Sequence, residues 1–157
     1  MVLMEEPQED FKIGQLTKEL VAIKLKKMAD PSATAANLVK QTLAVALKEI
    51  KPGSTGHHAV VEDACRGGIT GLLLAEQNLG KGAVLILEAV AELSSELNLD
   101  PTEMMRSALN GIADMRRFLR PDQLYDIHRE IELHFMGAGE VFSRMIKTAG
   151  RIAGTPP

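Results

Sequence analysis

Residues 57–79 read HHAVVEDACRGGITGLLLAEQNL, and their apolar and small side chains recur at intervals of three and four residues. This interval is typical of a helix that buries one face. The residues that form the buried stripe are Val61, Ala64, Cys65, Gly68, Leu72, Ala75 and Leu79. We therefore predict an amphipathic helix over 57–79, with Cys65 as a buried and unreactive thiol.

A row of small side chains follows one side of the same predicted helix. This small-residue row consists of Val60, Ala64, Gly67, Gly71 and Ala75, and it ends at Asn78. Glycine weakens a helix, and the close approach of a second backbone can compensate through dispersion contacts. We expect the row to pack against another helix. That helix belongs either to the same chain or, if the row is the seam of a homo-oligomer, to a second copy.

The rest of the chain shows the helical interval nearly throughout and no alternation typical of a strand. The further predicted helices cover 8–29, 33–50, 83–97, about 101–119 and about 122–150. The predicted fold is therefore an all-α helical bundle of about five or six helices with antiparallel neighbours. We expect 83–97 to be the central buried helix, because it is apolar around most of its circumference.

Proline, glycine and capping residues mark the expected helix ends. Asp30-Pro31-Ser32 separates the first two helices, with Ser32 as the N-cap of the second, and Asp100 caps the helix that begins at Pro101. Gly80-Lys81-Gly82 indicates a break after residue 79, since two glycines cost about 2 kcal/mol relative to alanine inside a helix. One continuous helix through residue 97 is the alternative.

Composition and organisation limit the class of protein. The turn at 51–56 divides the chain into an N-terminal helical hairpin, 1–52, and a bundle core, 53–157, which we expect to form one compact domain. The 157 residues are 45% hydrophobic and carry a net charge of −3, which does not suit a general nucleic-acid binder. One cysteine, and no signal-like or membrane-spanning stretch, indicate a cytoplasmic protein.

The common motifs of catalysis, phosphate binding and metal binding are missing, so we expect a non-enzymatic protein without a cofactor. The candidate metal ligands are His134, Glu130 and Glu92. Di-iron bundles use Glu-x-x-His on two helices, and this chain has no such pair, so we expect no bound metal. His134 lies on an apolar stripe, and we predict a core histidine satisfied by Glu130 or by a neighbouring helix.

Two charged surfaces stand out in the sequence. Glu88, Glu92 and Glu96 lie four residues apart and form an acidic stripe on the predicted central helix. Like charges at this spacing repel one another unless they are paired. We predict that a cation from 116–120 or 144–151 reaches the stripe, either within the chain or across an oligomer contact. The predicted first helix is basic, and its lysines either are solvated or contact an anionic surface or a partner helix.

Residues 62–72, EDACRGGITGL, resemble uncharacterised bacterial all-helical families. In their Ala-, Gly- and Leu-rich texture with few aromatics they also loosely resemble phasins, which coat polyester storage granules. This resemblance carries over no functional residue. The function that we expect first is self-association, as a homo-oligomer, or binding to another protein. The alternatives are a ferritin-like metal-binding bundle and a phasin-like protein of a granule or membrane surface.

Overall fold

The computed structural model describes residues 13–15, 17–18, 30–50 and 56–152, with side chains up to residue 148. The described part of the chain is helical and contains no strand, which confirms the predicted all-α bundle. Its elements are α2 (Pro31–Lys48), α3 (Gly56–Leu74), α4 (Leu79–Glu96), α5 (Pro101–Ala113), the 3₁₀ segment η2 (Asp114–Phe118), α6 (Pro121–His134) and α7 (Ala138–Ile152). The predicted helix over 8–29 lies mostly outside the described residues.

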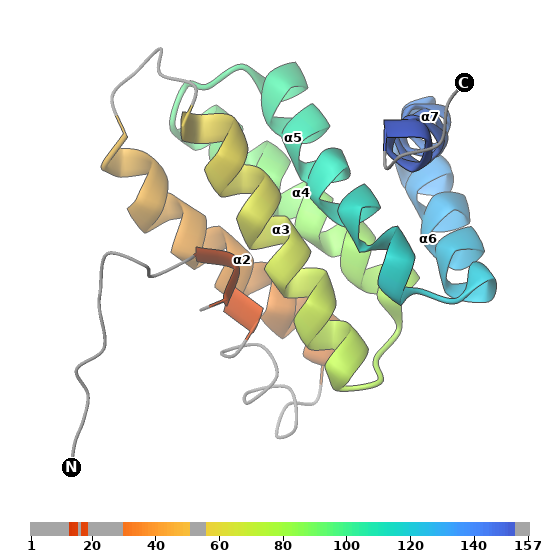
Figure 1. The fold of residues 1–157 in the computed structure, drawn as a ribbon. Coiled ribbons are helices and arrows are strands. Elements are labelled where there is room, and N and C mark those ends of the chain that lie inside the picture. Colours follow the sequence, from red (N-terminus) through yellow and green to blue (C-terminus); the bar gives the residue numbers. More distant parts are fainter. Residues whose placement is uncertain (1–12, 16, 19–29, 51–55, 153–157) are drawn as a thin grey trace.

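Helix α4 is the centre of the bundle, as predicted for 83–97. It packs against α2, α3, α5 and α6, and most of its residues are buried. From α2 to α5, consecutive helices run in opposite directions (Figure 1). In the pair α3 and α4, Leu72 lies beside Gly82 and Gly68 lies beside Ile86, so the two sequences advance in opposite senses.

Helices α3 and α5 lie side by side and run parallel, although they are not consecutive. Glu62 accepts a hydrogen bond from Asn110 at 3.0 Å, and one turn further along both helices Arg66 pairs with Asp114 at 3.0 Å. A Cβ atom on Gly111 would collide with the carbonyl oxygen of Glu62. The missing side chain at Gly111 therefore lets the two backbones touch.

Helices α2 and α4 form the second parallel pair. Asp30, at the start of α2, pairs with Lys81 near the start of α4 at 3.6 Å. Further along both helices, Lys40 pairs with Glu92 at 3.1 Å and with Glu96 at 3.0 Å. The helices α2 to α5 therefore form a four-helix bundle. Helices that follow one another in the chain are antiparallel, and the two non-consecutive pairs, α2–α4 and α3–α5, are parallel.

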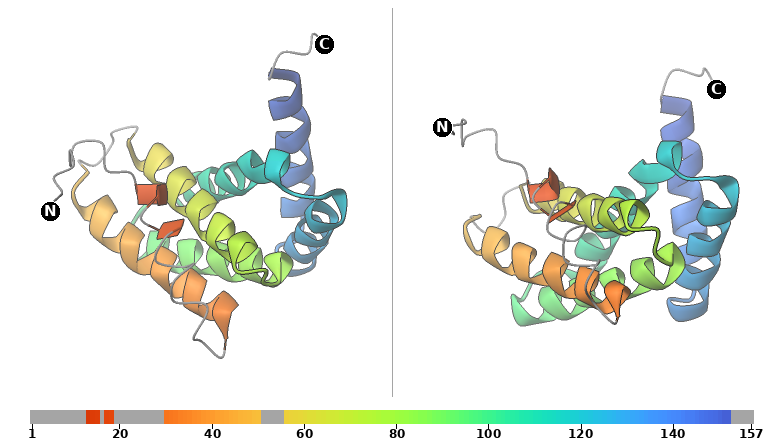
Figure 2. Two further views of the ribbon diagram at one scale, coloured as in Figure 1. Left: turned by 60° about the horizontal axis from the view of Figure 1, so that its bottom comes forward. Right: turned by 90° about the horizontal axis from the view of Figure 1, so that it is seen from below.

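Helices α6 and α7 stand together at one end of this bundle (Figure 2). The fully buried Phe142 of α7 joins the same hydrophobic core as Ile127 and Ile131 of α6. In both views of Figure 2 the C-terminal half of α7 extends past the other helices. In this half of α7, the helix is therefore only partly covered by the rest of the chain.

The break between α3 and α4 is real but lies earlier than the glycine pair predicts. It falls at Glu76, which has a positive φ of 57°, and at Asn78, whose side chain caps α4. Gly80 and Gly82 lie inside α4, where a Cβ atom on Gly82 would collide with Leu72. The predicted break at 80–82 is therefore wrong, because these glycines serve close packing between helices.

The predicted single helix over about 122–150 is also interrupted, by the turn between α6 and α7. Gly137 has φ of 91°, a conformation that glycine adopts at little cost. The Glu132 carboxylate accepts from the backbone N–H of Gly137 at 3.0 Å and of Gly139 at 2.9 Å. The apolar interval continues across the turn, so periodicity alone does not reveal it.

Two helix starts show how well local capping signals predict structure. Asp100 caps α5 as predicted, accepting from the backbone N–H of Thr102 at 2.9 Å. For α2 the predicted cap, Ser32, is wrong. Asp30 accepts from the N–H of Ala33 at 3.2 Å, while Ser32 is buried in the first turn.

We expect Gly111→Ala to lower the free energy of unfolding by about 1–3 kcal/mol, despite the higher helix propensity of alanine. The added methyl group has to displace the backbone of α3 at Glu62. Urea unfolding followed by circular dichroism measures the change. Arg106→Ala, at an exposed position of the same helix, is the control and should change stability by less than about 0.5 kcal/mol. Equal stability of the two variants would contradict the close α3–α5 contact.

Candidate functional site

The small-residue row of α3 meets the N-terminal segment, residues 13–15 and 17–18. A Cβ atom on Gly67 would collide with the carbonyl oxygen of Gly14. Of the row, Ala64, Gly67 and Gly71 are buried, while Val60 and Ala75 are partly buried. At Gly67 the approaching backbone therefore belongs to the same chain, and the role of the row as a seam between copies stays a prediction.

A polar network ties the N-terminal segment to α3 and η2. The carboxylate of Asp63 accepts from the backbone N–H of Gly14 at 2.7 Å and from Arg66 Nη1 at 2.9 Å. Arg66 Nη2 donates to Asp114 at 3.0 Å. These side chains are partly exposed, so each ion pair contributes only about 0–1 kcal/mol. The network acts mainly by fixing which segments are neighbours.

An apolar pocket of about 400 Å³ opens beside this network, between the N-terminal segment, α3 and η2. Leu74 and Phe118 border it and are 61% and 67% exposed. Inside it, the Thr70 hydroxyl donates to the Arg66 carbonyl oxygen at 2.7 Å and contacts Met115 Sδ at 3.3 Å. The polar groups next to the pocket are thus largely engaged with protein partners.

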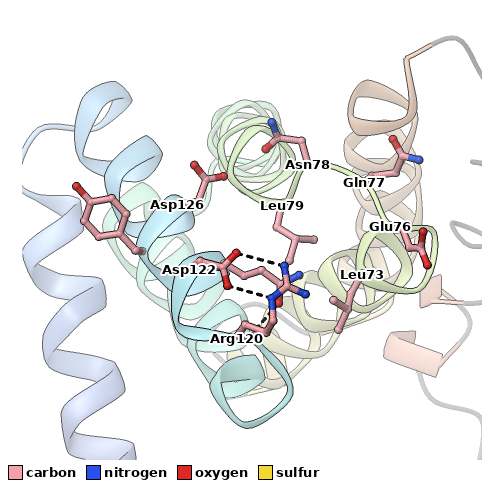
Figure 3. A pocket seen from close by; sticks show the side chains of 10 residues that line it. Leu73, Glu76, Gln77, Asn78, Leu79, Arg120, Asp122 and Asp126 are labelled. Carbon is pink, nitrogen blue, oxygen red and sulfur yellow. Dashed lines mark hydrogen bonds and ion pairs between the residues drawn. The ribbon is translucent and has the colours of Figure 1, made fainter.

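A larger and more polar pocket, of about 830 Å³, lies between the α3–α4 turn and the start of α6 (Figure 3). Arg120 and Asp122 face each other in it, with Arg120 Nε 3.0 Å from Asp122 Oδ1. This hydrogen bond lowers the pKa of Asp122 and raises the pKa of Arg120. Glu76 and Asp126 also line the pocket, but the close pair joins residues of one turn and resembles a helix-start contact more than a catalytic pair.

The acidic stripe has a cation, although not one of the predicted ones. Lys40 of α2 lies 3.0 Å from Glu96 and 3.1 Å from Glu92. The two carboxylates, Glu96 first, raise the pKa of Lys40. Within one chain, no described cation of 116–120 or 144–148 pairs with the stripe, so the predicted pairing is wrong there. The reason is that α2, and not η2 or α7, lies against this face of α4. The same pairing across an oligomer contact stays a prediction.

The candidate metal ligands are spread over the bundle. Glu92 lies on α4 and accepts a hydrogen bond from Lys40 of α2. Glu130 lies on α6 and accepts a hydrogen bond from Arg129 at 3.2 Å. His134 Nδ1 lies 3.0 Å from the Glu130 carbonyl oxygen, but its side chain is 48% exposed, so the predicted core placement is wrong. Among the described residues, no three His, Cys, Asp or Glu side chains gather as a metal site would require.

No pattern in the sequence indicates the partners of His58, near the start of α3. Its Nδ1 lies 2.8 Å from Ser107 Oγ, and its Nε2 lies 3.2 Å from a Glu103 carboxylate oxygen. Both partners belong to α5. The contact depends on the parallel arrangement of α3 and α5, which no local pattern in the sequence reveals.

Comparisons with protein-family models, with curated proteins and with solved structures find no match to this chain. The resemblance to phasins therefore stays a prediction. In the part of the chain that the structure describes, none of the helices has both the length and the apolar character required to cross a membrane.

We expect Asp63→Ala to speed hydrogen exchange at the Gly14 amide, because the variant removes the carboxylate that accepts from it. Loss of one such charge-assisted bond corresponds to about 1–3 kcal/mol of local stability. Nuclear magnetic resonance of the exchanging amides measures the effect. Asp114→Ala is the matched control, since it removes the other partner of Arg66 and leaves the Gly14 bond in place. Equal exchange in both variants would contradict the proposed attachment.

Cys65 is fully buried, as predicted, and burial raises the pKa of its thiol to about 12. The folded protein therefore keeps the thiol proton at a pH where the unfolded chain loses it. Below about pH 9 the ionisation of the thiol does not change the stability, but between about pH 9 and 12 it lowers the free energy of unfolding by about 1.4 kcal/mol per pH unit. We expect Cys65→Ala to flatten this decline in urea unfolding at pH 8, 9 and 10. Parallel declines in both proteins would contradict a buried neutral thiol.

Proposed function

We propose that this protein is a non-enzymatic helical bundle that acts by self-association through the end formed by α5, α6 and α7. The observation that carries the proposal is the exposed apolar surface there. Met136, in the α6–α7 turn, is 94% exposed, and Leu133 beside it is 69% exposed. Large apolar side chains that cluster at one exposed place are typical of interaction surfaces.

A groove of about 430 Å³ lies at this end between α5 and α7. Its apolar lining includes Met105, Leu109, Met136 and Val141. A groove between two helices can receive a third helix through apolar anchors at helical spacing. Methionine side chains are flexible and polarisable, so they adapt to the surface that enters. The groove therefore suits a helical partner.

The charges on α7 favour a second copy of the chain as that partner. Glu140 lies in the first turn of α7, and Arg144 and Lys147 lie toward its C-terminal end. In a dimer whose two-fold axis is perpendicular to α7, the two α7 helices run antiparallel, which brings Glu140 of each copy toward Lys147 of the other. Met145 and Ile146 of the same helix pack against the core of their own chain, which leaves the face of Glu140 and Lys147 on the outside.

The alternatives have less support. A ferritin-like function requires several acidic and histidine ligands that converge. Among the described candidates, Glu130 and His134 are neighbours on α6, whereas Glu92 lies on α4, and no group of three such side chains gathers. A granule or membrane surface would rely on the basic first helix, most of which lies outside the described residues. Self-association is the function that the described geometry favours.

We expect the wild-type protein to have about twice the 17.0 kDa mass of the chain. The double variant Leu133→Asp/Met136→Asp should be monomeric, because buried carboxylates without partners oppose association. Light scattering after size-exclusion chromatography measures both masses. Val45→Asp, at a similarly exposed position on α2, is the matched control and should remain dimeric. A monomeric wild-type protein at high micromolar concentration would overturn the proposal.

Charge reversal provides a second measurement of the same contact. Glu140→Lys and Lys147→Glu should each weaken dimerisation, by about 0.5–2 kcal/mol over the two symmetric contacts. The double variant should recover most of the loss, because opposite charges again face each other. Additive weakening in the double variant would contradict antiparallel α7 helices, even if the protein is dimeric.

A further inference from the structure

The apolar pocket between the N-terminal segment, α3 and η2 is separate from the self-association surface. It shares no lining residue with the groove between α5 and α7. We propose that this pocket binds a small amphiphile, a molecule with one apolar chain and one anionic group. This inference goes beyond self-association and does not depend on it.

The apolar part of the ligand is defined by the pocket walls. Leu73 and Leu74 of α3 line the pocket together with Met115 and Phe118 of η2. Met115 and Phe118 are three residues apart in a 3₁₀ segment, so their side chains emerge on one side. Leu74 and Phe118 are both largely exposed to water without a ligand. A bound apolar chain removes this surface from water and is stabilised by that removal.

The anionic part of the ligand follows from the charges of the lining. The ionisable lining groups are Lys18, Arg66 and Asp63, which sum to one positive charge. Arg66 already pairs with Asp63 and with Asp114. Lys18 has no ion-pair partner among the residues that the structure describes. Its ammonium group is therefore the cation available to a ligand carboxylate or another single anion.

The size of the pocket favours a single chain. A volume of about 400 Å³ is near the lower end of ligand pockets, which span about 300–1,000 Å³. A lipid with two acyl chains would leave most of its apolar surface in water. The ligand class is therefore a free amphiphile such as a medium-chain carboxylate, and not a membrane lipid.

Calorimetric titration with sodium octanoate and decanoate, both below their micelle concentrations, tests the proposal on the full chain. We expect saturable binding of one molecule per chain, about fourfold tighter for each added methylene that enters the pocket. Methyl resonances of Met115 should shift in nuclear magnetic resonance spectra. Lys18→Gln should weaken decanoate binding by about two- to fivefold and leave 1-decanol binding unchanged. Phe118→Ala should weaken the binding of both ligands.

Lys48→Gln, on α2 and outside the pocket, is the control and should bind decanoate like the wild type. Three outcomes would overturn the proposal: no saturable binding of decanoate, equal loss of decanoate binding in the Lys18 and Lys48 variants, or equal affinity for decyltrimethylammonium. Sedimentation with phosphatidylglycerol vesicles, without binding of free decanoate, would also overturn it and indicate a membrane surface instead. The Leu133→Asp/Met136→Asp variant should still bind decanoate, which separates this result from self-association.

Discussion

Contact between backbones on two sides of α3 sets the positions of the segments around it. On one side of α3, the carbonyl oxygen of Gly14 occupies the space that a side chain at Gly67 would need. On the other side, the carbonyl oxygen of Glu62 occupies the space that a side chain at Gly111 would need. Close approach multiplies dispersion contacts, which offset the weak helix propensity of glycine. Because the α3–α5 pair is parallel and in this register, Arg66 faces Asp114. A larger side chain at either glycine would shift that register.

The apolar pocket is a consequence of the same arrangement. Gly14 holds the N-terminal segment on α3 through Asp63, which places Lys18 at one wall. After Ala113 the chain tightens into η2 and turns away at Leu119, whose backbone is extended with ψ of 143°. This change of helix type places Phe118 at another wall. The pocket thus lies where three segments meet, each fixed by contacts distant in sequence.

Sequence signals within one segment predict most of the helices correctly. The features that they do not predict depend on contacts between helices. The apolar interval and the Asp100 cap are signals within one segment, and both are confirmed. The pairs Gly80/Gly82 and Gly137/Gly139 have the same spacing in the sequence. Gly82 nevertheless lies inside α4 against Leu72, whereas Gly137 lies after the end of α6 and has a positive φ. Only the neighbouring helix distinguishes them. The partner of the acidic stripe, Lys40, was missed for the same reason, since nothing local indicates that α2 and α4 are parallel.

The cysteine thiol of the chain is buried, whereas several large apolar side chains are exposed. Within the described residues, every buried side-chain nitrogen and oxygen has a hydrogen-bond partner, and the nucleophilic Cys65 is buried with a raised pKa. Catalytic groups usually combine access to substrate with a pKa moved toward neutrality, and this thiol has neither. Leu74 and Phe118 are exposed at the apolar pocket, and Leu133 and Met136 are exposed near the α6–α7 turn, whereas Val45 and Tyr125 are exposed elsewhere. Because the pocket and the groove between α5 and α7 share no lining residue, the ligand binding that we propose at one and the association that we propose at the other can be tested by separate substitutions.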